Sequence, residues 1–141
     1  MISADGDRFV RYSSNLTVTK GLHTSLDDTK EIYERQLHFG EMLARWGLAP
    51  RILKKDITDG DYITWVMEDA GLPITEKDVA DANALLDVLY DTGIVYSWSI
   101  HQSHFLRGFD GILRIIDFQH TEQLPNPITR DKRIYLQWRA S

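Results

Sequence analysis

Two amphipathic segments, each ended by a glycine, constrain the fold of this chain more than any other feature of its sequence. Residues 27–46 carry apolar side chains at helical spacing after a possible cap at Ser25, and they stop at Gly47. Residues 76–92 repeat the pattern and stop at Gly93. Stripes of this spacing with a glycine just beyond them predict two α-helices.

Strand-like patterns surround the first helix. Residues 8–20 alternate between polar and apolar side chains around Ser13-Ser14-Asn15, which predicts two short strands. Residues 50–57 and 62–68 flank the turn signal Asp59-Gly60-Asp61 and predict a hairpin. The first half of the chain is therefore expected to be a small antiparallel sheet with one helix across it.

The second half is expected to be the other helix followed by a β-hairpin. Phe105-Leu106 and the apolar run 112–116 lie on either side of a glycine-containing turn. The predicted fold class is α+β. With 141 residues, the chain is expected to be a single domain, in which residues 1–70 form the first part, 71–124 a reduced second part and 125–141 a tail.

Composition excludes some classes of function. The 16 Lys and Arg against 21 Asp and Glu give a net charge of −5, which argues against general nucleic-acid binding. There is no cysteine and no apolar run of membrane-spanning length, so we expect no disulfide, no thiolate metal site and no membrane segment. These features together predict a cytoplasmic protein.

Two charged residues stand at the ends of apolar strand patterns. Lys20 ends the face formed by Leu16 and Val18, and Asp117 directly follows the apolar run 112–116. A carboxylate at the exit of a buried strand is costly unless it is paired or acts on a ligand. Asp117 is therefore a candidate functional residue.

The order of these motifs resembles the protein kinase superfamily, nearest to the choline kinase, aminoglycoside phosphotransferase and RIO-like branches. Four segments carry the resemblance, which spans about residues 8–124. They are Leu16-Thr17-Val18-Thr19-Lys20, Gly47-Leu48-Ala49-Pro50, Val66-Met67-Glu68-Asp69-Ala70-Gly71, and the stretch from Leu89-Tyr90-Asp91-Thr92-Gly93 to Ile115-Ile116-Asp117-Phe118.

The resemblance implies a nucleotide site with ATP and Mg²⁺ or Mn²⁺. Lys20 would hold the phosphates, and Glu34 is the predicted partner of Lys20, although small-molecule kinases would place that glutamate where Gln36 stands. Glu68 and Ala70 would contact adenine through main-chain groups. Asp117 would bind the metal ion.

The sequence departs from the family where the catalytic loop is expected. Counting forward from Gly93 puts Trp98 at the catalytic aspartate, and counting back from Phe105 puts Ser99 there and His104 at the metal-binding asparagine. Neither count gives a carboxylate, which a proton acceptor of this kind requires. Gly6 is the only glycine before Lys20, so a glycine-rich phosphate loop is not expected either. Only twenty-four residues follow Asp117, which predicts a truncated domain.

The main functional prediction is a pseudokinase-like protein that acts as a protein-binding or regulatory module, with at most residual nucleotide binding and no phosphotransfer, and whose partner is another protein or a second copy of the chain. Aromatic and arginine residues dominate interface hot spots, so Trp65, Trp98, Tyr135 and Trp138 are candidate contact residues. The alternative is an active minimal ATP-dependent phosphotransferase in which His101 or His104 replaces the missing base. A third hypothesis is a metal centre formed by His101, His104, Asp117 and His120.

Overall fold

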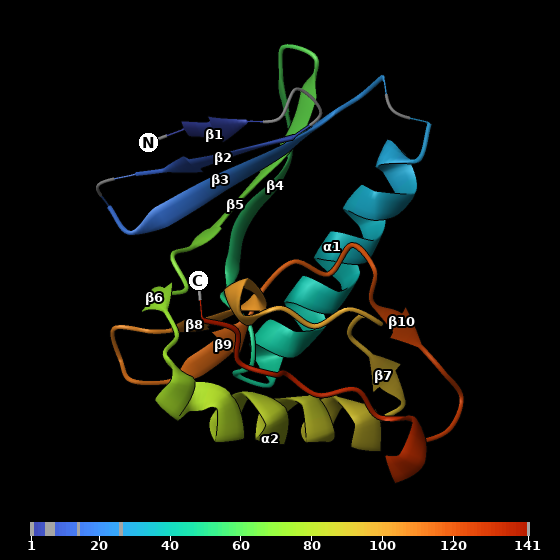
Figure 1. The fold of residues 1–141 in the computed structure, drawn as a ribbon. Coiled ribbons are helices and arrows are strands. Elements are labelled where there is room, and N and C mark those ends of the chain that lie inside the picture. Colours follow the sequence, from blue (N-terminus) through green and yellow to red (C-terminus); the bar gives the residue numbers. More distant parts are fainter. Residues whose placement is uncertain (1, 5–7, 14, 26, 141) are drawn as a thin grey trace. The chain divides into compact units, whose positions relative to one another are not determined.

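The computed structural model describes residues 2–4, 8–13, 15–25 and 27–140. The chain forms two compact units, Met1–Asp69 and Ala70–Ser141, which Figure 1 shows in blue to green and in green to red. Each unit is α+β, as predicted. Ser14, in the first predicted turn, and Gly6 lie outside the described residues.

The first unit is built on a five-stranded antiparallel sheet. Its strand order is β1-β2-β3-β5-β4. The strands are β1 (Ile2–Ala4), β2 (Arg8–Tyr12), β3 (Thr17–His23), β4 (Ile52–Asp59) and β5 (Tyr62–Glu68). The two predicted strands around residue 14 and the predicted hairpin around Gly60 are therefore confirmed, while β1 was not predicted. Gly60 has a φ of 60°, which a glycine adopts without the steric cost other residues meet.

One helix, α1 (Thr29–Arg45), covers a face of this sheet (Figure 1). The rings of Tyr33 on α1 and Trp65 on β5 meet edge to face, with centroids 5.6 Å apart. Gly47, with a φ of 77°, follows the end of the helix as predicted. The expected cap at Ser25 is wrong, because the cap position is Asp28 and the Ser25 hydroxyl lies 2.6 Å from the His23 ring.

The second unit begins with its helix. A single 3₁₀ turn, Glu76–Asp78, leads into α2 (Val79–Asp91). The Thr75 main-chain N–H donates to the Asp78 carboxylate at 2.9 Å, which closes the first turn. Ala82, Leu86 and Leu89 on α2 are completely buried, so this stripe forms the core of the unit as expected.

Two small sheets complete the regular structure of the second unit. The hairpin of β8 (Phe105–Arg107) and β9 (Leu113–Ile115) is confirmed, and β6 (Leu72–Pro73) adds a third strand beside β8. The second sheet pairs β7 (Ile94–Val95) with β10 (Glu122–Gln123). The pairings of β6 and of β10 were not predicted.

The end of the chain runs beside α2 without forming a strand or an α-helix (Figure 1). After a 3₁₀ turn at Arg130–Lys132, residues 133–139 form a segment that we call the strap. The Arg133 guanidinium donates to Asp87 at 2.8 Å and to Asp91 at 2.7 Å, both on α2. Tyr135 also donates to Asp87, at 2.5 Å. The tail, whose structure the sequence left open, is thus fastened to α2. No helix in the described parts of the chain is long and apolar enough to cross a membrane.

Candidate functional site: a loop, a strained aspartate and a pocket

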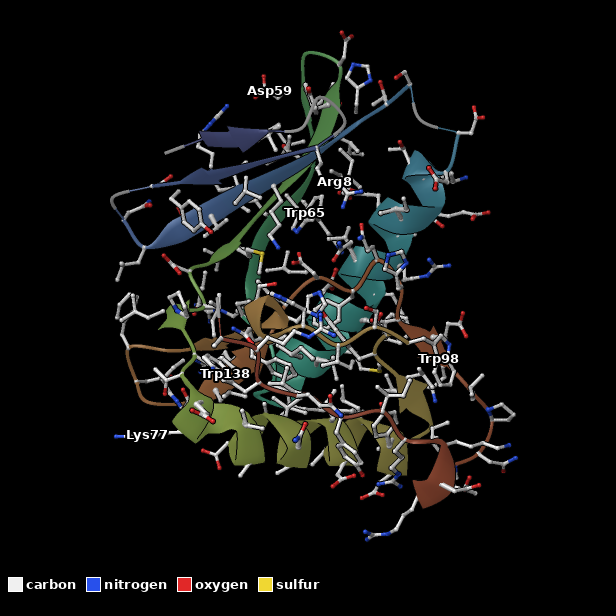
Figure 2. The ribbon with its side chains drawn as sticks, viewed as in Figure 1. Arg8, Asp59, Trp65, Lys77, Trp98 and Trp138 are labelled. Carbon is white, nitrogen blue, oxygen red and sulfur yellow. The ribbon has the colours of Figure 1, made fainter. Side chains whose placement is uncertain are left out.

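Lys20 lies on the face of the first unit's sheet that α1 covers. It stands on β3 between Val18 and Leu22, both buried, and pairs across the sheet with Trp65. Directly opposite residues of antiparallel strands share a face, and Trp65 contacts Tyr33 of α1. Figure 2 labels Trp65 on the α1 side of the sheet. The half-buried Lys20 thus has its stem among apolar side chains.

The acidic residue predicted to pair with Lys20 lies on the outside of α1. Glu34 is exposed, whereas Gln36 is buried at 9% exposure on the same face as Tyr33 and Leu37. The buried face of α1 therefore carries the Gln36 amide, at the position where the resemblance to small-molecule kinases would place the glutamate. The pairing of Lys20 with Glu34 stays a prediction.

The segment predicted to contact adenine is fixed at its beginning by main-chain bonds within the first unit. The Glu68 N–H donates to Arg51 at 2.9 Å, and the Asp69 N–H donates to Leu16 at 2.8 Å. The Glu68 carboxylate also pairs with Arg51 at 2.8 Å. Ala70, the first residue of the second unit, is buried at 4% exposure. Adenine binding by Glu68 and Ala70 stays a prediction.

The loop from Tyr96 to His104 folds onto itself through its own polar groups. The Ser97 hydroxyl accepts the Ser99 N–H at 3.2 Å. His101 accepts the Ser103 N–H at Nδ1, at 3.1 Å, and His104 accepts the His101 N–H at Nδ1, also at 3.1 Å. The last two bonds close the 3₁₀ turn Gln102–His104.

These hydrogen bonds limit what the two histidines can do as bases. A neutral imidazole has one acceptor nitrogen, and in both His101 and His104 that nitrogen is occupied by a main-chain N–H. The other nitrogen then carries the proton. Burial lowers the pKa of His104, and the charge of Asp117 offsets this only in part. His104 is therefore a neutral donor rather than a ready proton acceptor.

Asp117 has a strained backbone. Its φ of 66° is in the left-handed region, which non-glycine residues seldom adopt and which clusters at functional sites. The preceding residue is held firmly, because Ile116 donates its N–H to His104 at 2.9 Å and accepts the Tyr96 hydroxyl at its carbonyl. Burial raises the pKa of this Tyr96 hydroxyl well above its usual value, so it stays protonated.

The histidines and Asp117 lie within electrostatic reach of each other, but they do not form a metal centre. The charges of His101 and His120 lower the pKa of His104, and that of Asp117 raises it. Within the described residues, no group of three or more His, Cys, Asp or Glu side chains is arranged to hold a metal ion. The structure thus gives no support to the four-residue metal hypothesis. A magnesium ion held by one carboxylate and nucleotide phosphates needs no such cluster.

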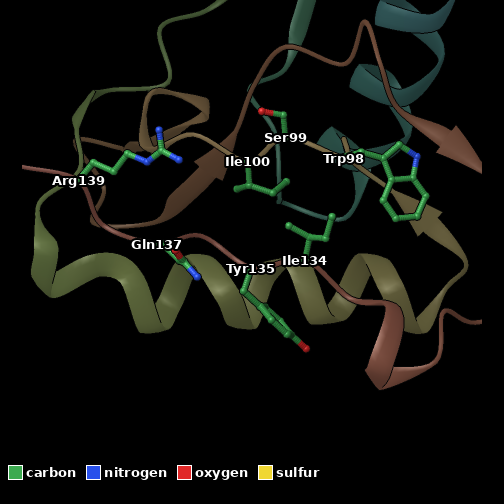
Figure 3. A pocket seen from close by; sticks show the side chains of 7 residues that line it. All are labelled: Trp98, Ser99, Ile100, Ile134, Tyr135, Gln137 and Arg139. Carbon is green, nitrogen blue, oxygen red and sulfur yellow. The ribbon is translucent and has the colours of Figure 1, made fainter.

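A pocket of about 290 Å³ lies between the loop and the strap, within the second unit (Figure 3). Its lining residues are Trp98, Ser99, Ile100, Ile134, Tyr135, Gln137 and Arg139. Sequence reasoning selected Trp98 and Tyr135 as contact residues but did not find the pocket, because it exists only where the strap passes the loop.

The four predicted contact aromatics differ in exposure. Trp98 is 54% exposed, and Tyr135 and Trp138 are half-buried. Trp65 is 4% exposed, so its predicted place on an open surface is wrong. Alternation in β5 put Trp65 on the face that α1 covers.

Comparisons with known proteins show the fold and not the activity. The sequence matches no protein-family model and no curated protein. The structure is similar to that of WbdD, a bifunctional kinase-methyltransferase, with a TM-score of 0.58, 15% identity, and coverage of 84% of this chain and 31% of that one. A 2.2 Å crystal structure of WbdD gives a TM-score of 0.63 at 15% identity, covering 89% of this chain and 33% of that one.

A co-crystal structure of WbdD with the kinase inhibitor LY294002 gives a TM-score of 0.55 at 14% identity, covering 85% of this chain and 32% of that one. The chain spans about a third of the length of WbdD. Its fold resembles part of that kinase, which supports the kinase-like fold predicted from the sequence but does not distinguish the branch.

Proposed function

We propose that this chain is a kinase-like module that binds a protein partner and does not transfer phosphoryl groups. One observation carries the proposal. The loop from Tyr96 to His104 contains no carboxylate, and the acceptor nitrogens of its two histidines are both occupied by main-chain N–H groups. Phosphoryl transfer needs a group that accepts or orients the proton of the nucleophile.

The exposed part of the same loop supports a binding role. Trp98 presents more than half of its surface to solvent, and an exposed tryptophan is the side chain most enriched at interface hot spots. The pocket beside Trp98 adds the arginine Arg139. Both residues lie in the second unit, so this binding surface is formed within one unit of the chain.

The second candidate function is an active phosphotransferase. The left-handed φ of Asp117 favours it, because backbone strain at a carboxylate marks functional sites. In this hypothesis Lys20 holds the phosphates of ATP, Asp117 binds Mg²⁺ or Mn²⁺, and His101 or His104 replaces the missing base. The histidine must first give up its main-chain hydrogen bond or change tautomer, which makes this function the less supported of the two.

Thermal unfolding with and without nucleotide shows whether the chain binds ATP, and a phosphotransfer assay separates the two candidates. The Tm of the wild type is measured with ATP and Mg²⁺ or Mn²⁺, beside the Lys20→Ala and Asp117→Ala variants, because a ligand of the folded state raises Tm. Lys54→Ala, a lysine exposed on β4, is the matched control. We expect no release of ADP from ATP and no transfer of phosphate to added acceptors.

A metal-dependent phosphotransfer activity that is lost in Asp117→Ala and kept in Lys54→Ala would overturn the proposal. Nucleotide binding without turnover, lost in Lys20→Ala, would leave it standing and would show that the chain keeps a nucleotide site.

A further inference from the structure

The strap is held to α2 through the main chain of two alternate residues, Ile134 and Leu136. The Tyr90 hydroxyl accepts the Ile134 N–H at 3.1 Å and donates to the carbonyl of the same residue. The Asn83 amide does the same for Leu136, accepting its N–H at 2.7 Å and donating to its carbonyl at 3.3 Å. Ile134 and Leu136 are two positions apart, and both direct their main-chain N–H and C=O groups towards α2. This alternation is typical of an extended, strand-like main chain.

The opposite edge of the strap faces the loop that carries Trp98. In an extended chain, the N–H and C=O groups of the intervening residues point the other way. The Gln102 side chain binds Arg139 there, accepting its N–H at 3.0 Å and donating to its carbonyl at 3.0 Å. The main-chain groups of Tyr135 and Gln137 lie on this edge, and among the described residues they have no hydrogen-bond partner.

The pocket beside this edge is rich in unused donors. Trp98, Ser99, Gln137 and Arg139 line it, and their side chains make no hydrogen bond or ion pair with the described residues. No acidic side chain is among the lining residues. Ile100 and Ile134 supply an apolar surface between Trp98 and Arg139, and the ring of Tyr135 points away towards α2 (Figure 3).

Arg139 and Arg133, six residues earlier, differ in whether an acidic side chain compensates their charge. Arg133 pairs with Asp87 and Asp91 and also donates to the Ile128 carbonyl, so its charge is compensated. Arg139 is exposed and has no such partner in the described part of the chain. A guanidinium beside an apolar surface and unused donors favours a carboxylate next to an apolar group.

We propose that the pocket and the free edge of the strap bind a short, extended, acidic peptide segment of a partner protein. The peptide main chain pairs with Tyr135 and Gln137 as an added strand. A Glu or Asp of the peptide reaches Arg139, and a neighbouring apolar side chain packs on Ile100 and Ile134. The inference rests on the proposed binding function and names the chemistry of its partner.

A nucleic acid fits this site less well than a peptide. The chain carries a net charge of −5, and the pocket has a single cation, so a polyanion gains little there. Free N–H and C=O groups on one edge match the alternating donors and acceptors of another peptide main chain.

The test is an NMR titration of the full chain with three matched hexapeptides. The probe is acetyl-Thr-Val-Glu-Val-Thr-Val-amide, and the two controls replace its Glu by Gln or by Lys. We expect the Glu peptide to shift the Trp98 indole signal and the amide signals of Tyr135 and Gln137, and to slow hydrogen exchange of those two amides. The Gln peptide binds about tenfold more weakly, because the ion pair between Arg139 and a carboxylate is replaced by a hydrogen bond from Arg139 to a neutral amide oxygen. The Lys peptide does not bind.

Two variants separate the two parts of the site. Arg139→Gln weakens binding of the Glu peptide about tenfold and that of the Gln peptide by a smaller factor, while Arg130→Gln, an exposed arginine outside the pocket, changes neither. Gln137→Pro removes an N–H that has no partner in the described residues, so the strap stays docked but binding of both peptides is lost.

Three results would overturn the inference: no shift with the Glu peptide at millimolar concentration, equal binding of the Glu and Lys peptides, or binding that survives Gln137→Pro. If free N-acetylglutamate binds as tightly as the peptide, the site takes small carboxylates and the peptide part is wrong. The titration is independent of phosphotransfer, so an active enzyme that binds the Glu peptide would refute the proposed function and keep this inference.

Discussion

The two units of the chain differ in the kind of hydrogen bond that stabilises each of them internally. In the first unit, five strands join main chain to main chain in a continuous sheet. In the second, the longest strands have three residues, and side chains such as Tyr90, Asn83 and Tyr96 bond directly to the main chain of distant segments. The first unit thus draws its order from a repeating ladder, and the second from a few particular residues.

This difference predicts unequal sensitivity to mutation. A sheet spreads its hydrogen bonds over many residues, and exchanging a side chain leaves its ladder intact. Where a single side chain bonds both the N–H and the C=O of a main-chain segment, its removal breaks two hydrogen bonds at once. The buried main-chain groups are then left without a partner. Single polar substitutions should therefore be more damaging in the second unit than in the first.

The largest effect is expected for Arg133→Met. The side chain of Arg133 is only 6% exposed, bonds Asp87, Asp91 and the Ile128 carbonyl, and lies over the Tyr90 ring. Met keeps the apolar stem but none of these bonds. We expect a lower Tm and rapid trypsin cleavage at Lys132, measured by thermal unfolding and by mass spectrometry of the digest.

Arg130→Met is the control for this variant, because Arg130 is an exposed residue of the same basic segment. It should leave Tm and the cleavage rate at Lys132 near the wild-type values. Equal damage in the two variants would mean that the charge of the tail matters and the specific bonds of Arg133 do not.

A pair of tyrosine substitutions compares the units directly. Tyr90→Phe removes two bonds to the main chain of Ile134 and should cost about 2 kcal/mol of unfolding free energy. Tyr33→Phe removes two bonds to Asp56, a residue exposed to water, and should cost about 1 kcal/mol. Urea unfolding of both variants measures the difference, and a larger loss for Tyr33→Phe would contradict the comparison.

The pH dependence of the second unit should carry the signature of His104. Burial lowers its pKa below the usual 6.5, so the unfolded chain takes up a proton that the folded chain resists. Stability is therefore expected to fall as the pH drops through 6.5. His104→Asn, whose amide oxygen can still accept the His101 N–H, should flatten this slope. NMR titration of the ring signals gives the pKa itself, and a value above 6.5 would contradict the expectation.

The smallest effect is expected in the first unit, at Leu16. This exposed leucine has a φ of 61°, a conformation that Asn tolerates better. Leu16→Asn should stabilise the chain by about 0.5 to 1 kcal/mol. Leu53→Asn is the control, an exposed leucine on β4 without a positive φ, and it should bring no gain in urea unfolding.

The same contrast explains which parts of the fold were predictable from the sequence. Repeating patterns predicted the strands of the first unit except β1, both helices and the hairpin of β8 and β9. Strands of two residues, such as β6, β7 and β10, are too short to show a period. The docking of the strap left no pattern at all, because it depends on the positions of Tyr90 and Asn83 along one helix.

For the candidate site, sequence reasoning identified individual residues better than their surroundings. It selected Asp117, whose backbone is strained, and Trp98, which is exposed. It did not predict that the acceptor nitrogens of His101 and His104 bond main-chain N–H groups and close a turn, since this depends on loop geometry. The roles assigned to Lys20, Glu34, Glu68 and Ala70 stay predictions.

Alternate residues of the strap have different roles: some attach the segment to α2, and others line the pocket. The main chains of Ile134 and Leu136 anchor the segment on α2, while the side chains of Gln137 and Arg139 line the pocket. Gln137 and Arg139 are exposed, so they can be exchanged with little cost to folding, and a library varied there would change the chemistry of the pocket on one scaffold. The peptide preference that we propose could then be varied without redesigning the core.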